Sequence, residues 1–107
     1  MKVIDLEGSA HDAVTANPTR PATAVLHDTP AVRLVVFRIE PGQQVAMHTN
    51  PGTVLLTVIS GNGTILGDNE SHEVGVGSMV AYAPGELHGM QAASEQFCLL
   101  ATIIHAH

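Results

Sequence analysis

The chain has 107 residues, the length of one domain; 45% of its residues are apolar and 13% are charged. Ten Asp and Glu residues against four Lys and Arg residues give a formal net charge of −6, which argues against a nucleic-acid partner, because phosphate backbones attract basic surfaces. No apolar run approaches the roughly 20 residues that cross a bilayer, and the first residues do not form a secretory signal, so we expect a cytoplasmic protein without a membrane partner.

The first 30 or so residues are the least regular part of what we expect to be a single domain over residues 1–107. Asn17–Pro21 is predicted to be an exposed loop, because each proline removes a backbone donor and disfavours helix. Gly8–Thr15 has room for one helical turn at most.

From residue 31 onward, short apolar and β-branched runs are separated by glycine and proline turns. The expected strands are Ala31–Ile39, Val45–His48, Thr53–Ser60, Thr64–Leu66, Ser71–Val76, Ser78–Ala83, His88–Ala92 and Glu95–His105. Many short strands at regular spacing indicate an all-β sandwich or barrel of antiparallel strands.

Two spaced motifs within residues 42–92 resemble those of the cupin family. The first cupin motif reads G-x5-H-x-H-x3–4-E-x6-G. This chain keeps the spacing, with Gly42, His48 and Gly61 in place, and it has Asn50 and Val54 where the second His and the Glu stand. The second motif reads G-x5-P-x-G-x2-H-x3-N, and the matching positions here are Gly77, Ala83, Gly85, His88 and Ala92, with Pro84 one place after the expected proline.

The resemblance implies a jelly-roll β-barrel whose motif histidines point inward. In cupins the two His and the Glu of the first motif, together with the His of the second, hold a divalent metal. Carried over to this chain, the metal ligands would be His48, Asn50 and His88, since Val54 cannot ligate. Imidazole suits iron, manganese, nickel, copper or zinc. A further ligand could come from Gln44, Gln91 or His105.

A pocket without metal is the alternative, and the sequence leaves it open. In it, His48 and His88 bind a small organic molecule or act on it as catalytic residues, because the pKa of imidazole lies near 6.5. A non-catalytic module for a sugar or an effector is compatible with the reduced ligand set, and so is a purely structural role for both rings. If the parity of the strand holds, Val54, Leu56 and Val58 face the pocket, and Tyr82, Met79, Met90 and Phe37 are further candidates for its lining.

The remaining functional candidates are weaker. His11, His27 and His72 are expected at the surface, and His105 and His107 at a frayed terminus. The lone cysteine, Cys98, lies in an apolar run and is expected to be buried. The resemblance also implies a homodimer, for which Val3–Leu6 could add a strand to the sheet of a neighbouring copy.

Overall fold

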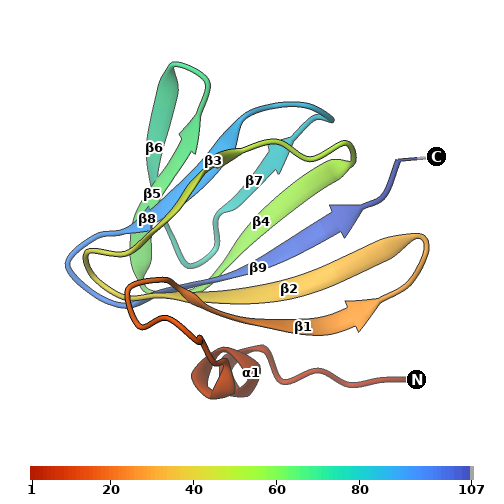
Figure 1. Ribbon diagram of the computed structural model, residues 1–107, viewed down its shortest axis with the longest axis horizontal. Coiled ribbons are helices and arrows are strands. Elements are labelled where there is room, and N and C mark those ends of the chain that lie inside the picture. Colours follow the sequence, from red (N-terminus) through yellow and green to blue (C-terminus); the bar gives the residue numbers. More distant parts are fainter. Residues whose placement is uncertain (107) are drawn as a thin grey trace.

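The structure of the protein is a computed structural model that describes residues 1–106. One short helix, α1, precedes a series of strands (Figure 1). The elements run α1 (Leu6–Asp12), β1 (Ala22–Asp28), β2 (Val32–Ile39), β3 (Gln44–His48), β4 (Thr53–Ser60), β5 (Asn62–Gly67), β6 (Glu70–Gly75), β7 (Met79–Tyr82), β8 (His88–Ala92) and β9 (Phe97–Ile104). No helix among residues 1–106 is long and apolar enough to span a membrane.

The strands form two sheets, which confirms the predicted all-β jelly roll. The larger sheet has the order β1-β2-β9-β4-β7 and the smaller one β3-β8-β5-β6, and every pairing within them is antiparallel. Strands that are distant in sequence, such as β2 and β9, are therefore neighbours, as a jelly roll requires.

The core lies between the two sheets and follows the two-residue alternation of the strands. On β4, Val54, Leu56 and Val58 are buried, so the predicted parity of this strand is confirmed. The buried apolar cluster that they join is Ile39, Val54, Leu56, Val58, Ile65, Tyr82, Met90, Phe97, Leu99 and Ala101. Cys98 is buried on the other side of β9, as expected.

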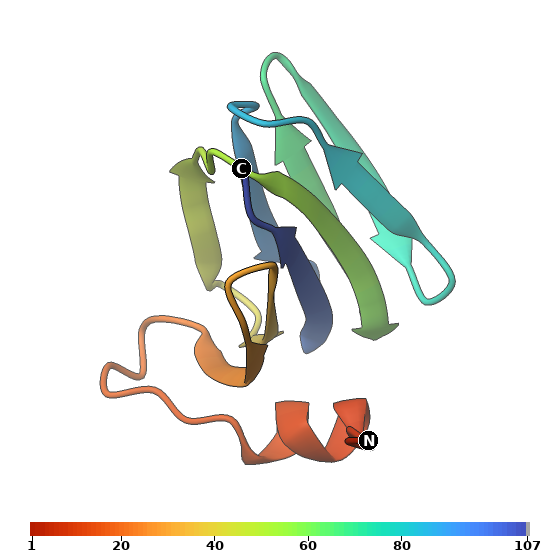
Figure 2. The ribbon, with the colours of Figure 1, turned by 90° about the vertical axis from the view of Figure 1, so that its right-hand side faces the viewer.

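The N-terminal segment is more regular than its sequence suggested. The prediction of at most one helical turn was too short, because α1 runs for seven residues from Leu6, with the Asp5 side chain accepting a hydrogen bond from the Gly8 N–H as N-cap. Carbonyls at the end of α1 and at its C-cap Ala13 accept three hydrogen bonds from Nη1 of Arg38 on β2. Helix α1 thus lies against the larger sheet (Figure 2). Strand β1 was not predicted either, and Leu6 belongs to α1, so Val3–Leu6 is not a strand in this chain.

The strands from residue 32 onward match their predicted positions: β4 and β8 have the predicted bounds, and the ends of the other strands are shifted by at most two residues. Strand β5 begins two residues earlier than predicted, at Asn62, because Gly61 alone makes the turn from β4. Gly61 has φ +74°, and a Cβ there would lie 1.9 Å from the backbone oxygen of Gln96. Only glycine fits this corner.

Candidate functional site

The imidazole rings of His48 and His88 lie against each other. His48 ends β3 and His88 begins β8, and the two residues are directly opposite in the antiparallel register. Their ring centroids are 4.0 Å apart, with the ring planes inclined at 57°. The structure therefore brings together the two histidines that the motifs single out, although they are forty positions apart in the sequence.

A β-bulge in β3 gives His48 its inward direction. Val45 is opposite the buried Met90 and packs on the core, so simple alternation would turn His48, three residues later, to the outer face. Between these two pairs β3 has one residue more than β8, which restores the inward direction at His48. Gly89 leaves space for the bulge, since a Cβ there would lie 3.0 Å from Sδ of Met47.

Backbone carbonyl groups fix the tautomer of both rings. Nδ1 of His48 lies 2.9 Å from the Ala46 oxygen, and Nδ1 of His88 lies 3.2 Å from the Glu86 oxygen. A carbonyl oxygen only accepts hydrogen bonds, so each Nδ1 carries the proton and donates it. Each Nε2 of a neutral ring therefore has a free lone pair, which can accept a hydrogen bond, take up a proton or bind a metal ion.

The two rings differ in their exposure. His88 is 3% exposed, whereas His48 is exposed. Burial lowers the pKa of His88 below its ordinary value of 6.5; the hydrogen bond to the Glu86 carbonyl acts in the opposite direction, and the nearby ring of His48 adds to the lowering. His88 is thus held neutral at neutral pH, with its Nε2 lone pair available.

Tyr82 completes the inner wall behind His88. Its ring centroid lies 5.0 Å from that of His88, and its hydroxyl group donates a 2.9 Å hydrogen bond to the Leu66 carbonyl on β5. Burial raises the pKa of Tyr82 to about 12, with smaller contributions from the carboxylates of Glu86 and Glu70. At neutral pH this side chain is a fixed, protonated part of the wall.

Asn50 is engaged in a local turn. Its Oδ1 accepts a 2.8 Å hydrogen bond from the Gly52 N–H, and its backbone carbonyl accepts one from the Gly85 N–H. The side-chain oxygen that was predicted as a metal ligand thus stabilises the loop between β3 and β4. Binding a metal through it would require this turn to give up that hydrogen bond.

The donor set does not fit the metal of a complete cupin site. Val54 is 3% exposed and belongs to the apolar core, so the fourth ligand position contributes only hydrocarbon. Within residues 1–106, no group of three or more His, Cys, Asp or Glu side chains is placed to hold an ion. Two imidazoles without a carboxylate leave the charge of a divalent cation uncompensated.

The other suggested ligands lie away from the pair. Gln91 alternates with the inward-facing Met90 and is opposite Gln44, so both belong to the outer face of the smaller sheet. His105 follows the end of β9, where its N–H donates to the Ala31 carbonyl. His11, His27 and His72 lie on α1, β1 and β6, and His107 is outside the described residues.

The lining that the sequence suggested is only partly found near the rings. Tyr82 packs on His88, and Met90 is buried in the core. Met79 is 60% exposed, on the outer face of β7. Phe37 packs on the core. Neither the bulge in β3 nor the role of the Glu86 carbonyl was predicted, because neither depends on a side chain that a motif could show.

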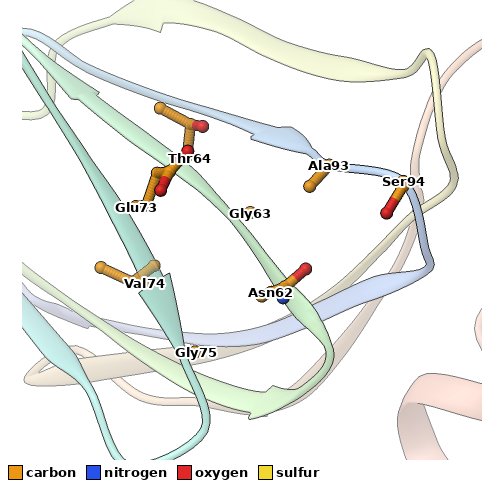
Figure 3. A pocket seen from close by; sticks show the side chains of 8 residues that line it. All are labelled: Asn62, Gly63, Thr64, Glu73, Val74, Gly75, Ala93 and Ser94. Atoms are coloured by element: carbon orange, nitrogen blue, oxygen red, sulfur yellow. The ribbon is translucent and has the colours of Figure 1, made fainter.

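A hollow of about 380 Å³ is lined by residues other than the imidazole pair. It is formed by β5, β6 and the segment between β8 and β9, and Figure 3 shows Thr64 and Glu73 side by side above it. Its lining residues are Asn62, Gly63, Thr64, Glu73, Val74, Gly75, Ala93 and Ser94. It contains no imidazole and does not include the predicted site.

Comparisons with known proteins agree with this architecture. The family model of the cupin domain matches residues 35–104, which is more than half of the chain. A search of curated protein sequences found no match. Among solved structures, an uncharacterized conserved protein with a double-stranded β-helix domain from Klebsiella pneumoniae is 24% identical, with a TM-score of 0.84 over 97% of this chain and 90% of its own.

Two further structures are similar to this chain over nearly its whole length. An RmlC-like cupin protein from Desulfovibrio desulfuricans is 23% identical, with a TM-score of 0.82 over 97% of this chain and 96% of its own. A conserved protein of unknown function from Streptococcus pyogenes is 25% identical, with a TM-score of 0.80 over 99% of this chain and 89% of its own. The paired motif histidines, the two-sheet jelly roll and the match of the family model together show that this chain belongs to the cupin family.

Proposed function

We propose that the protein binds a small, hydroxyl-bearing organic molecule at the imidazole pair, with Nε2 of His48 and His88 as hydrogen-bond acceptors. The observation that carries this proposal is the engagement of both Nδ1 atoms by backbone carbonyls. It leaves two acceptors side by side at the surface end of the barrel, one of them on a ring whose pKa is lowered by burial.

The surroundings favour a neutral ligand with both polar and apolar parts. Met47 and Leu87 are 40% and 37% exposed, and each directly precedes one of the two histidines. Glu86 and the net charge of −6 disfavour an anion at this end of the barrel. A sugar or another polyhydroxylated metabolite provides donors for both Nε2 atoms and C–H surface for the apolar rim.

Thermal unfolding in the presence of sugars, organic acids and phenols tests this proposal. A ligand that binds only the folded protein raises the melting temperature. His48→Gln should abolish the increase, because it removes one of the two imidazole acceptors. His48 is exposed, so its replacement leaves the core intact. His11→Gln on α1, where the side chain is 89% exposed, should leave the increase unchanged. A sugar-induced or phenol-induced shift that persists in His48→Gln, or no shift with any sugar or phenol, would contradict the proposal.

A two-histidine metal centre is the second candidate function, favoured by the same free Nε2 atoms. His48 and His88 would hold the ion, which would supply Lewis-acid chemistry when bound; the remaining positions would have to come from water or ligand. Elemental analysis of the purified protein and titration with zinc, nickel and copper distinguish the two candidates. Uptake of one equivalent that His48→Gln abolishes would support the metal centre and replace the first proposal.

We also propose a homodimer formed through the larger sheet. Among the described residues, the outer face of β9, β4 and β7 has no Asp, Glu, Lys, Arg or His side chain, so two copies with a charge of −6 can meet there without opposing carboxylates. Its residues are Thr53, Leu55, Thr57, Met79, Ala81, Leu100, Thr102 and Ile104. Met79 and Ile104 are 60% and 44% exposed.

Analytical ultracentrifugation at micromolar concentration tests the homodimer. We expect the mass of two chains for the wild type and of one chain for Leu55→Lys, because the lysine places a charge at the centre of the face. Glu73→Lys, on the outer face of the smaller sheet, is the matched control and should remain dimeric. A monomeric wild type would contradict the proposal.

A further inference from the structure

The sandwich is open along one side, between β1 and β3. Thr23 and Val25 are opposite Phe37 and Val35 on β2, and this register turns all four side chains toward the smaller sheet. Nevertheless Val25 is 51% exposed and Thr23 is also exposed. The smaller sheet ends at β3 and does not extend over β1, so the inner face of β1 is uncovered.

A cleft of about 440 Å³ occupies this open side, which is enough for a small organic molecule. Its wall is mainly apolar, with half-buried Phe37 and Val45 at the back and Pro21 beside them. Its lining includes Arg20, Pro21, Thr23, Phe37, Gln44 and Val45. Along β3 the cleft extends to Ala46, whose carbonyl accepts the hydrogen bond from Nδ1 of His48, but neither imidazole ring lines the cleft.

Arg20 stands at the rim of this cleft with a guanidinium group that the described residues leave unpaired. The chain has four Lys and Arg residues. Lys2 donates to a backbone carbonyl of β1, Arg33 lies 3.9 Å from Asp28, and Arg38 donates to carbonyls of α1. For Arg20 within residues 1–106, the only hydrogen bond is that of its backbone N–H to a carbonyl.

An unpaired guanidinium group beside an apolar wall suits a ligand with a carboxylate group and an apolar body. A guanidinium group binds a carboxylate with two parallel hydrogen bonds, and these are stronger than bonds between neutral groups. Phe37 and Val45 provide hydrocarbon surface for the body of the ligand. Glu40 lines the adjoining depression near Arg20, but its carboxylate accepts hydrogen bonds from Gln96.

We propose that the cleft between β1 and β3 is a second binding site, which takes a small carboxylate with an apolar body through Arg20 and Phe37. The imidazole pair takes no part in it. A carboxylate that binds here would contact both sheets, because Phe37 belongs to the larger sheet and Val45 to the smaller one. The two sheets would then be joined at the side where they are otherwise open.

Titration with benzoate, followed by backbone amide chemical shifts in NMR spectra, tests this site. The amides of Thr23, Phe37 and Gln44 should shift in a saturable manner up to about 10 mM benzoate, while those of His48 and His88 stay in place. Benzamide, which has the same shape without the charge, should bind at least about ten-fold more weakly.

Two variants separate charge from packing. Arg20→Gln should weaken benzoate binding about ten-fold or more, whereas Arg33→Gln, which removes an equal charge elsewhere on the surface, should change it less than about two-fold. Phe37→Leu should weaken benzoate and benzamide equally. Equal binding of benzoate by the two arginine variants, equal binding of benzoate and benzamide by the wild type, or an absence of shifts in the three cleft amides would overturn the proposal.

Discussion

The two sheets of this barrel are packed to different degrees. Of the seven largest fully buried side chains, five lie in the larger sheet, and only Ile65 and Met90 come from the smaller one. On β3 and β6 most residues are exposed, yet β3 and β8 of this sheet contain both histidines. The larger sheet supplies most of the stability, while the thinly covered smaller sheet leaves His48 accessible to ligand.

Core truncations should show the largest contrast between the sheets. Leu56→Ala on β4 should cost about 3 kcal/mol of unfolding free energy, because it leaves a cavity at a position that is 1% exposed. Val45→Ala on β3 should cost about 1 kcal/mol, since this side chain is only half-buried. Val58→Ala on β4 is the matched control for size and should cost about 2 kcal/mol. Urea unfolding measures all three, and equal costs for the two valines would contradict the comparison.

A glycine of the smaller sheet makes room for the largest buried side chain of the other sheet. A Cβ on Gly63 would lie 2.3 Å from the Phe97 ring and 2.5 Å from the Gln91 carbonyl oxygen. Gly63→Ala should therefore destabilise the protein by about 2 kcal/mol, because the two sheets would have to separate.

Gly75→Ala is the control for this effect. Gly75 lies on the neighbouring strand, and its Cβ would meet nothing closer than 3.9 Å. The change should be neutral or slightly stabilising, by up to about 1 kcal/mol, because it restricts the unfolded chain. If Gly63→Ala were as stable as Gly75→Ala in urea unfolding, the close packing between the sheets would not be a constraint.

Tyr82 connects the two sheets by a hydrogen bond from β7 to the Leu66 carbonyl. Tyr82→Phe should cost about 1 kcal/mol at neutral pH. Between pH 10 and about 12 the unfolded wild type is ionised while the folded tyrosine is not, so the wild type loses stability as pH rises and the variant does not. The difference between the two proteins should shrink and then reverse. Since this is the sole tyrosine, its ultraviolet titration reports the pKa directly, and a value near 10 would contradict the buried environment.

The sequence predicted the fold well because the turns are local. Glycine and proline positions mark the corners, and β4 and β8 lie where they were expected. The helix and β1 were missed because contacts with residues distant in sequence stabilise them. Arg38, more than 20 residues away, donates hydrogen bonds to the end of α1, and β1 depends on its pairing with β2.

The sequence predicted which histidines form the site, but it did not predict which of the neighbouring side chains are free to bind a ligand. Motif spacing identified His48 and His88, which the structure brings together. The same spacing suggested Asn50 as a ligand, but spacing does not show that a side chain is already bonded to its own turn. Arg20 fits no motif, and its isolation becomes visible only when the partners of the other cations are known.

The smallest expected effect is the loss of folding stability at acidic pH that the buried ring of His88 causes. The lowered pKa of His88 means that the unfolded chain binds a proton near pH 6.5 while the folded chain does not, so stability is full above about pH 6.5 and falls as pH decreases toward the folded pKa. His88→Gln should lose this part of the pH dependence and approach the wild type in stability as pH falls. Urea unfolding at several pH values, together with NMR titration of the His88 ring, measures both. A His88 pKa at or above 6.5 would show that this ring is not desolvated, and then the smaller sheet would be open at both histidines rather than at His48 alone.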